Sequence, residues 1–301
     1  MEKEIPIIKH IVLSGGGQSI FTFYGVIKKA NETGLWNRSN IESIYGTSAG
    51  AILSLFIALK CDWKQIDDYL IKRPWDKVFN INLDSVVSIM NKFGFFEINV
   101  IHEIFKPLFA INDISIDITM KEFYEIYNID IHIYTTELNK FETVDISHTT
   151  HPDWRLLDAI YCSCNVPLLF APYINEVNNE YKCYIDGGIL CDFPLDICCE
   201  KYDKDNIFAL RKINIQSMEH ITNESNFFNY MDCIFKKSGN KLLEQSNITN
   251  IKNIIHIYDN MVSIEDVLKV SSSKEKREEM INEGIKLFED FYNDNYKTFD
   301  N

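Results

Sequence analysis

Short apolar runs alternate along the chain with longer segments in which apolar side chains recur every three or four residues. The short runs have the length and the branched side chains typical of buried strands: 8–13, 41–45, 129–135, 180–185, 207–210 and 254–258. Helical spacing characterises the segments 22–33, 49–59, 153–163, 226–243 and 273–293. Strands joined by helical crossovers indicate an α/β protein with a mainly parallel sheet.

The rest of the pattern favours a single structural unit. The middle of the chain, about 62–128, is mostly helical and amphipathic, and a hairpin partner at 141–145 follows the strand at 129–135. Gly34 is placed to end the first helix, while Thr119 and Glu122 have the spacing of a capping box at the start of a later one. No Gly/Ser-rich or Pro-rich linker and no internal repeat interrupts the chain.

We therefore expect a three-layer α/β/α fold with a mainly parallel central sheet. Residues 8–210 would form the catalytic core, and the strand and helices of 211–301 would pack on the same domain.

The composition narrows the possible partners. Apolar residues make up 46% of the chain, enough for a sizeable core, and 30 basic against 44 acidic side chains give a net charge of −14. Such a chain repels phosphate backbones, and it has no basic patch, so we expect no nucleic-acid partner. The same charge disfavours constitutive adsorption to anionic membranes.

Targeting and metal signals are scarce. The N-terminus has no apolar stretch typical of a signal peptide, and the longest apolar segment, 49–59, falls short of the roughly 18 residues that span a bilayer. The 8 cysteines form no C-x-x-C pair, which favours reduced thiols in an intracellular protein. His148 and His151 lack a nearby third ligand, so we expect neither a metal nor another cofactor.

A pentapeptide between a predicted strand and a predicted helix has the form G-x-S-x-G. It reads Gly46-Thr47-Ser48-Ala49-Gly50. This context is the one that a nucleophile elbow needs, because the serine must sit at a sharp turn where flanking glycines avoid a clash. The following helix would direct its positive N-terminal end at developing negative charge.

A run of three glycines, Gly15, Gly16 and Gly17, follows the first predicted strand. Adjacent backbone N–H groups at such a junction form a concavity that suits an oxyanion. A phosphate-binding P-loop would need Gly-Lys-Ser/Thr at its end, and a dinucleotide fingerprint would need a third glycine at Ile20. Neither requirement is met.

Asp186, Gly187 and Gly188 end another predicted strand. An Asp-Gly pair alone usually marks a turn. In a chain that also carries the elbow, a carboxylate at the end of a strand can approach the serine and serve as its base.

These three motifs, in this order and spacing, resemble the patatin-like phospholipase family of lipid acyl hydrolases, which use a Ser–Asp dyad. The resemblance is carried by 13–17 with 25–27, by 45–51, and by 185–189 with Phe193 and Pro194. The segment 159–171 is similar to the one that precedes the family's Asp-Gly pair. The similarity covers about residues 8–200, with a fainter match in the final helix.

The resemblance implies a phospholipase A or lysophospholipase type of reaction on a lipid at a membrane or micelle surface. Ser48 would attack the ester carbonyl and form an acyl-enzyme. Asp186 would accept the proton and then activate water. The amides of Gly15–Gly17, above all Gly16 and Gly17, would form the oxyanion hole. The oligomeric state stays open.

Two positions depart from the family pattern. Members usually carry Arg or Lys and then Gly where this chain has Ser19 and Ile20, so a cation near the oxyanion or the lipid phosphate is missing there. Asp192 stands where relatives often have Asn, and a second carboxylate could raise the pKa of Asp186 if the two lie close together. The lipid headgroup and the position of cleavage are not determined by the sequence.

Two alternatives remain open. An α/β-hydrolase with a Ser-His-Asp triad would use His220 or His256, although that fold places several strands before the elbow. A patatin-like lipid-binding protein that is weak or inactive as an enzyme is suggested by Ser19 and Ile20. We expect the phenylalanines between 93 and 109 to pack in the core, with an acyl pocket as the alternative.

Overall fold

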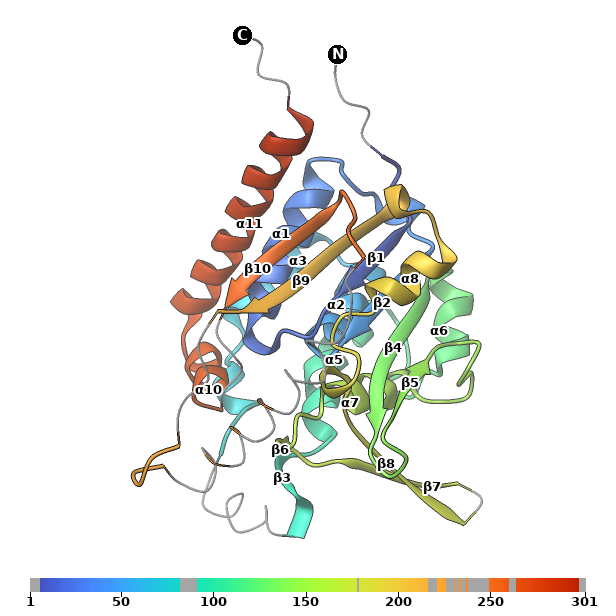
Figure 1. The fold of residues 1–301 in the computed structure, drawn as a ribbon, viewed down its shortest axis with the longest axis vertical. Helices are drawn as coiled ribbons and strands as arrows, with labels where there is room; N and C mark the ends of the chain where they lie inside the picture. Colours follow the sequence, from blue (N-terminus) through green and yellow to red (C-terminus); the bar gives the residue numbers. More distant parts are fainter. Residues whose placement is uncertain are drawn as a thin grey trace.

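The computed structural model describes residues 6–81, 91–177, 179–215, 221–225, 230, 233, 237, 249–259 and 264–297. Its centre is a mixed, mainly parallel sheet with helices packed against it (Figure 1), which confirms the expected α/β class. The strands follow the order β10-β9-β1-β2-β4-β8-β7, and β5 also pairs with β4. Their bounds are β1 His10–Leu13, β2 Ser43–Thr47, β4 Asp130–Glu137, β5 Glu142–Ile146, β7 Tyr173–Val177, β8 Glu180–Asp186, β9 Ile207–Asn214 and β10 Ile254–Asp259.

Most of the described helices lie in segments that were predicted to be helical. Their bounds are α1 Ile20–Glu32, α2 Ala49–Ala58, α3 Trp63–Lys72, α5 Asn99–Ile111, α6 Met120–Tyr127, α7 Leu156–Cys164, α8 Leu195–Lys201, α10 Ile264–Ser272 and α11 Lys274–Tyr296. The predicted capping box is confirmed, because Thr119 and Glu122 exchange hydrogen bonds at the start of α6. Gly34 follows α1 with φ +80°, a left-handed conformation that glycine adopts without strain.

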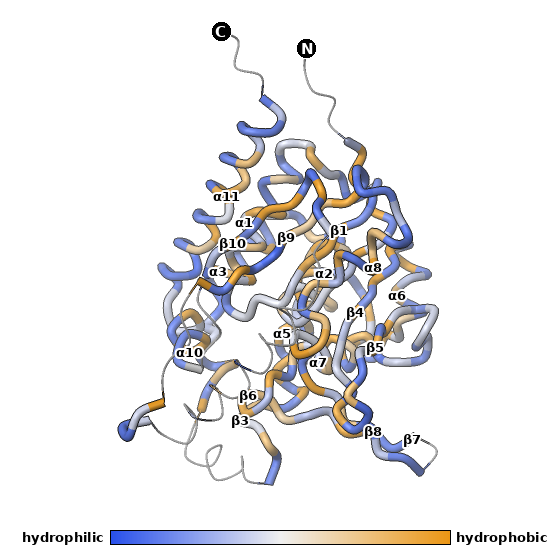
Figure 2. Tube along the Cα trace, in the orientation of Figure 1, coloured by the Kyte–Doolittle hydropathy of each residue, from blue (hydrophilic) through white to orange (hydrophobic). Residues whose placement is uncertain are grey.

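Successive side chains along each strand point to opposite faces of the sheet and so contribute to two hydrophobic cores of unequal size. Ile11, Leu13 and Ile44 face the larger core beneath α1, α2 and α7. Val12 and Tyr45 face a smaller one that is covered by α8. Orange apolar segments accordingly run through the middle of the molecule in Figure 2. The layers on the two sides of the sheet are therefore unequal in the part of the chain that is described.

Helices α1 and α11 lie side by side along one flank of the molecule (Figure 1). Their backbones approach closely at two glycines. A Cβ atom on Gly25 would lie 2.1 Å from the carbonyl oxygen of Ile281, and one on Gly284 would lie 2.0 Å from that of Thr22. The final helix thus packs directly on the helix that follows the Gly15–Gly17 loop.

The pairing of β4 brings two distant segments together. The first part of β4, Asp130–Tyr134, pairs with the parallel strand β2, and the last part, Thr135–Glu137, pairs with the antiparallel strand β8. The antiparallel strand β5 pairs with Ile133–Glu137 of β4. Because β5 overlaps both partners, β2 and β8 must share the opposite edge of β4 and meet end to end. Thr47 pairs with Tyr134 and Asp186 with the next residue, Thr135. The residue after β2 therefore lies beside the last residue of β8.

Several short elements were not predicted. β3 Gly94–Phe96 and β6 Leu168–Phe170 form a separate two-stranded sheet, and β7, α8 and α10 were also missed. The helix expected over 226–243 lies almost entirely outside the described residues. Within the described ranges, no helix combines the length and the apolar character needed to cross a membrane.

Candidate active site

Ser48 stands at the junction of β2 and α2 in a conformation rare for a residue with a side chain. Its φ of 52° and ψ of −117° mark a sharp turn. The flanking glycines make this turn possible, since a Cβ on Gly50 would lie 2.4 Å from the carbonyl oxygen of Leu13. One on Gly46 would lie 2.7 Å from that of Gly50. The pentapeptide thus has the backbone of a nucleophile elbow.

A second serine, Ser163 in α7, holds this turn in place. Its hydroxyl accepts the N–H of Ser48 at 2.8 Å and donates to the carbonyl oxygen of Tyr134 at 2.6 Å. The thiol of Cys164 donates to the carbonyl of Ser48 at 3.2 Å. Sequence reasoning missed Ser163, because a buried serine within a helix carries no distinguishing pattern.

Asp186 is 6% exposed and lies at the end of β8, beside the elbow. Its Oδ1 accepts the N–H of Gly188 at 2.7 Å. Its other oxygen, Oδ2, is buried and accepts no hydrogen bond of standard geometry from the described residues. Burial raises the pKa of this carboxyl to about 6, although hydrogen bonds from Ser48 and Gly188 oppose the rise. Gly187 is required here, since a Cβ on it would lie 2.1 Å from the carbonyl oxygen of Tyr134.

The Gly15–Gly17 loop lies against the elbow, because a Cβ on Gly15 would be 3.6 Å from the Cβ of Ser48. The amide of Gly15 donates to the carbonyl of Asp192 at 2.9 Å. The structure shows no hydrogen bond from the amides of Gly16 and Gly17 to any described residue. Gly17 has φ +53°, which glycine tolerates. Two of the three predicted oxyanion donors are thus available.

Asp192 lies between this loop and Asp186. A Cβ on Gly15 would come within 2.4 Å of its Oδ1, and one on Gly188 within 3.2 Å. Burial, and then repulsion from Asp186, raise the pKa of Asp192 to about 7, while Lys212 and Arg211 on β9 oppose the rise. The repulsion that the sequence suggested between the two carboxylates is thus present, and it favours the protonated form of one of them.

An apolar cavity of about 150 Å³ opens beside Ser48. It extends between α3, α5 and α10, and its walls include Gly17, Gln18, Ile52, Phe56, Trp75, Phe79, Ile104, Val166, Phe170 and Val267. Phe96, Phe105 and Phe109 lie in the core, as expected, whereas the expectation is wrong for Phe93, which is 62% exposed. The cavity is lined almost wholly by aliphatic and aromatic side chains, which suits an acyl chain.

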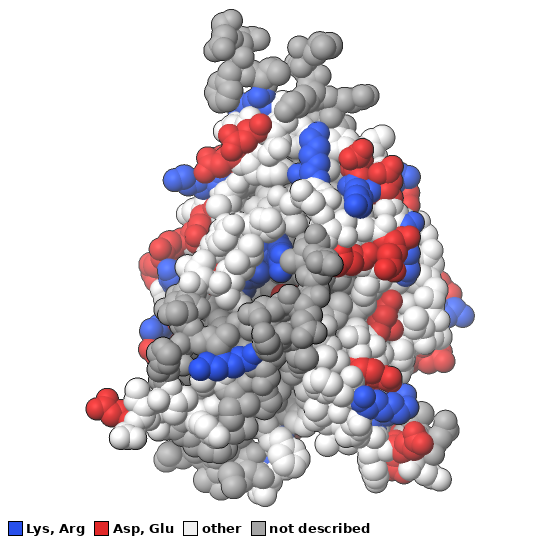
Figure 3. Space-filling model, in the orientation of Figure 1, with Lys and Arg blue, Asp and Glu red and all other residues white. Residues whose placement is uncertain are grey.

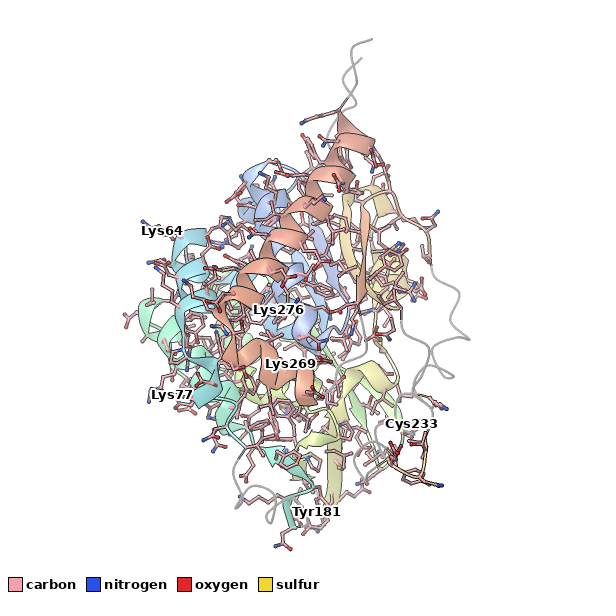
Figure 4. All side chains as sticks on the ribbon, turned by 90° about the vertical axis from the view of Figure 1, so that its left-hand side faces the viewer. Lys64, Lys77, Tyr181, Cys233, Lys269 and Lys276 are labelled. Carbon is pink, nitrogen blue, oxygen red and sulfur yellow. The ribbon has the colours of Figure 1, made fainter. Side chains whose placement is uncertain are left out.

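Ser19 stands at the position where the sequence lacks a cation, and its side chain forms a hydrogen bond that links two elements. Its hydroxyl donates to Oδ2 of Asp259 at 2.5 Å and so joins the loop to β10. A polar cavity of about 600 Å³ lies nearby, between α10, α11 and the end of β10. Two lysines project from these helices, Lys269 and Lys276 (Figure 4). Each pairs with a glutamate of its own helix, so neither replaces the cation missing from the loop.

The histidines do not complete a triad in the described part of the chain. His256 lies on β10 beside Arg211, and burial followed by that cation lowers its pKa. His220 lies outside the described residues. His148 bonds to Asp130 and His151 to Thr150, and no group of three potential metal ligands occurs among the described residues.

Comparisons with known proteins show which family and which relatives this chain resembles. The family model for patatin-like phospholipase matches residues 11–198. The chain is 28% identical over 201 residues to the "Probable lipid hydrolase 463L" of Invertebrate iridescent virus 6, a match that covers 66% of each protein. It is 23% identical over 197 residues to the "Uncharacterized protein YqhO" of Bacillus subtilis, covering 61% of this chain and 64% of that protein. The matches thus span just under two thirds of the length of these relatives.

A solved structure shares the fold. The crystal structure of VipD from Legionella pneumophila superposes with a TM-score of 0.56 at 17% identity, covering 99% of this chain and 69% of VipD. At this identity the similarity concerns the fold alone.

Proposed function

The chain belongs to the patatin-like phospholipase family, and from this premise we propose that it hydrolyses carboxylic esters of lipids through a Ser48–Asp186 dyad. The observation that carries the proposal is the end-to-end meeting of β2 and β8 on β4. It places an elbow serine and a buried carboxylate side by side. The catalytic domain would comprise the segments 8–210 and 211–301 together, because β9 runs across residue 210.

Acylation begins when Oγ of Ser48 attacks the ester carbonyl carbon. Asp186 takes the hydroxyl proton directly, and its pKa of about 6 leaves it mostly ionised and yet basic near neutral pH. Collapse of the tetrahedral intermediate releases the alcohol and leaves an ester on Ser48. Asp186 then activates a water molecule that hydrolyses this acyl-enzyme.

The oxyanion hole is assigned to the amides of Gly16 and Gly17. The amide of Ser48 is already bonded to Ser163, and that of Gly15 to Asp192, so neither is available to the oxyanion. Two preorganised N–H donors are the number that such a hole commonly provides, and removal of one costs about 10²–10³-fold in rate.

The acyl chain of the substrate would occupy the apolar cavity beside Ser48. Its walls offer few polar groups to recognise a headgroup, so the cavity selects for a hydrocarbon chain rather than for a particular alcohol. We propose a phospholipase A or lysophospholipase type of activity at a membrane or micelle surface. We also propose an intracellular location, because the 8 cysteines form no C-x-x-C pair and fit reduced thiols.

A digest of mixed-lipid vesicles, followed by mass spectrometry of the released fatty acids, tests the proposal. Wild type should release fatty acids, and Ser48→Ala should release at least about 10³-fold less. Ser54→Ala is a matched control, because this hydroxyl in α2 has the carbonyl of Gly50 as its only hydrogen-bond partner among the described residues. Release by Ser48→Ala at the wild-type rate would contradict the dyad. A folded wild type without hydrolysis would favour a lipid-binding protein.

A further inference from the structure

Asp192 lies among the residues of the proposed active site but is not a member of the dyad. The loop that carries it is fastened on both sides: Asp192 accepts the amide of Gly15 at 2.9 Å, and the hydroxyl of Thr47 donates to the carbonyl of Cys191 at 2.9 Å. Asp192 therefore keeps a fixed position relative to the elbow and the glycine loop.

Its carboxylate shares a small space with Asp186. A single Cβ placed on Gly188 would lie 2.9 Å from Oδ1 of Asp186 and 3.2 Å from Oδ1 of Asp192. Both oxygens therefore line the same face of Gly188, and Oδ1 of Asp192 also lies against Gly15. A negative charge here is close both to the base and to the amides assigned to the oxyanion.

The charged groups that act on Asp192 come from two strands. Asp186 on β8 repels its carboxylate, whereas Lys212 and Arg211 on β9 attract it. Next to it, Cys191 has a pKa raised to about 12, first by burial and then by Asp192, and so stays a neutral thiol. Basic side chains lie over β9 on this face of the molecule (Figure 3). These opposing influences leave Asp192 able to exist as a neutral carboxylic acid or as a carboxylate.

The two states of Asp192 have opposite effects on the tetrahedral intermediate. A neutral carboxylic acid adds no charge near the oxyanion, and the amides of Gly16 and Gly17 stabilise it unopposed. A carboxylate a few ångströms away adds repulsion in a site that excludes much of the water, where such interactions are strong. Proton loss from Asp192 to solvent is the only chemical change that separates the states.

We propose that Asp192 controls the reaction through its charge, allowing acylation as a neutral acid and slowing it as a carboxylate. This inference rests on the proposed function. Since Asp186 must lose its proton and Asp192 must keep its own, the rate has a maximum in a narrow pH range. Burial and Asp186 raise the pKa of Asp192 to about 7, and burial raises that of Asp186 to about 6, so this range lies near pH 6–7.

The test compares the pH profile of kcat/KM for wild type and Asp192→Asn on a p-nitrophenyl acyl ester. Asparagine has the same shape and no charge. The profiles should coincide near pH 6, and at pH 8.5 the variant should be about tenfold faster because its alkaline decline is gone. Asp196→Asn removes an equal charge from α8, where the residue accepts the amide of Thr249, and should keep the wild-type profile.

Arg211→Gln supplies a second, independent shift. Without this cation the carboxylate of Asp192 is less favoured, so its pKa rises and the alkaline decline moves to higher pH. In the Asp192→Asn background the same substitution should leave the profile unchanged. An Arg211→Gln shift that persists in that background would contradict the proposal.

A measurement independent of activity separates failure of the inference from failure of the proposed function. Because folding raises the pKa of Asp192 above its unfolded value near 4, wild type loses stability as the pH rises from about 4 to 7. The Tm advantage of Asp192→Asn should therefore grow over that range. If both proteins hydrolyse esters with the same alkaline decline, or if the Tm advantage does not grow, the inference is overturned. Absence of hydrolysis together with a growing Tm advantage contradicts only the proposed function.

Discussion

At the scale of single residues, the site depends on a few atoms that the backbone holds in unusual places. Ser48 keeps a strained φ because Gly46 and Gly50 let three backbone segments pass within contact distance, and because Ser163 accepts its amide. These contacts fix the backbone of the elbow, and with it the direction of the Cα–Cβ bond of Ser48, before a substrate arrives. Such preorganisation would allow the proposed two-residue dyad to work without a histidine.

A histidine outside the proposed active site, His132, contributes to the stability of the fold. His132 on β4 is 4% exposed, stacks on Tyr45, and bonds to Asp145 at 2.8 Å and Asp130 at 3.1 Å. Burial opposes its protonation, but the bonds to the two carboxylates outweigh burial and raise its pKa to about 9. The charged form therefore stabilises the fold fully below pH 6.5, and this contribution is lost as the pH rises to about 9.

His132→Gln tests this contribution. The free energy of unfolding of wild type should exceed that of the variant by of the order of 3 kcal/mol near pH 6, with the difference shrinking towards pH 9. Urea denaturation across this range measures it. His102→Gln on α5, which is remote from these carboxylates, serves as the control. A difference that stays constant or grows with pH would show that protonation of His132 does not stabilise the fold.

At the scale of elements, the packing of α11 on α1 depends on close backbone contact. Gly284→Ala would place a Cβ 2.0 Å from the carbonyl oxygen of Thr22, so the helices would have to move apart. We expect a loss of about 1–3 kcal/mol in the free energy of unfolding, despite the better helix propensity of alanine.

Asn282→Ala is the matched control, because residue 282 lies on the exposed face of the same helix. It should leave stability unchanged or slightly raised. Unfolding by urea measures both variants. If Gly284→Ala were as stable as Asn282→Ala, the close contact between α1 and α11 would be contradicted.

The sequence predicts the long elements and fails on the short ones for physical reasons. β1, β2, β4, β8 and α11 have strong periodicity or capping residues such as Ser273, which accepts the amide of Lys276. β3 and β6 have three residues each, too few to show alternation. They exist because Phe96 and Phe170 meet in the folded chain.

The residues of the candidate site also fall into those that the sequence identifies and those that only the structure identifies. Ser48, Asp186 and the loop glycines are recognisable because each belongs to a local motif with its own spacing. Ser163, Arg211 and Lys212 carry no such motif, and only the tertiary structure brings them to the site. Asp192 is recognisable in the sequence as a departure from the family pattern, but only the structure shows that its carboxylate lies beside Gly15 and Gly188.

At the scale of the whole molecule, the net charge of −14 bears on the choice of lipid surface. Acidic side chains are spread over the visible face, with basic ones interspersed (Figure 3). Ser19 bonds to Asp259 and contributes no cation to the glycine loop. Repulsion should therefore make hydrolysis slower on anionic vesicles than on zwitterionic ones, and added salt should reduce the difference.

Vesicles of fixed acyl composition with rising anionic lipid content measure this effect, with fatty acid release as the readout. Added salt at constant lipid composition provides the control for electrostatics. Faster hydrolysis on the anionic vesicles would mean that a local cationic site outweighs the net charge.

The central claim is that Ser48, activated by Asp186, is the nucleophile. The most direct measurement is the rate and position of labelling by a fluorophosphonate, mapped by mass spectrometry of peptides. We predict a single adduct on Ser48, its loss in Ser48→Ala, a much slower reaction in Asp186→Asn and an unchanged rate in His256→Gln. An adduct on another residue, or loss of labelling in His256→Gln, would contradict the account.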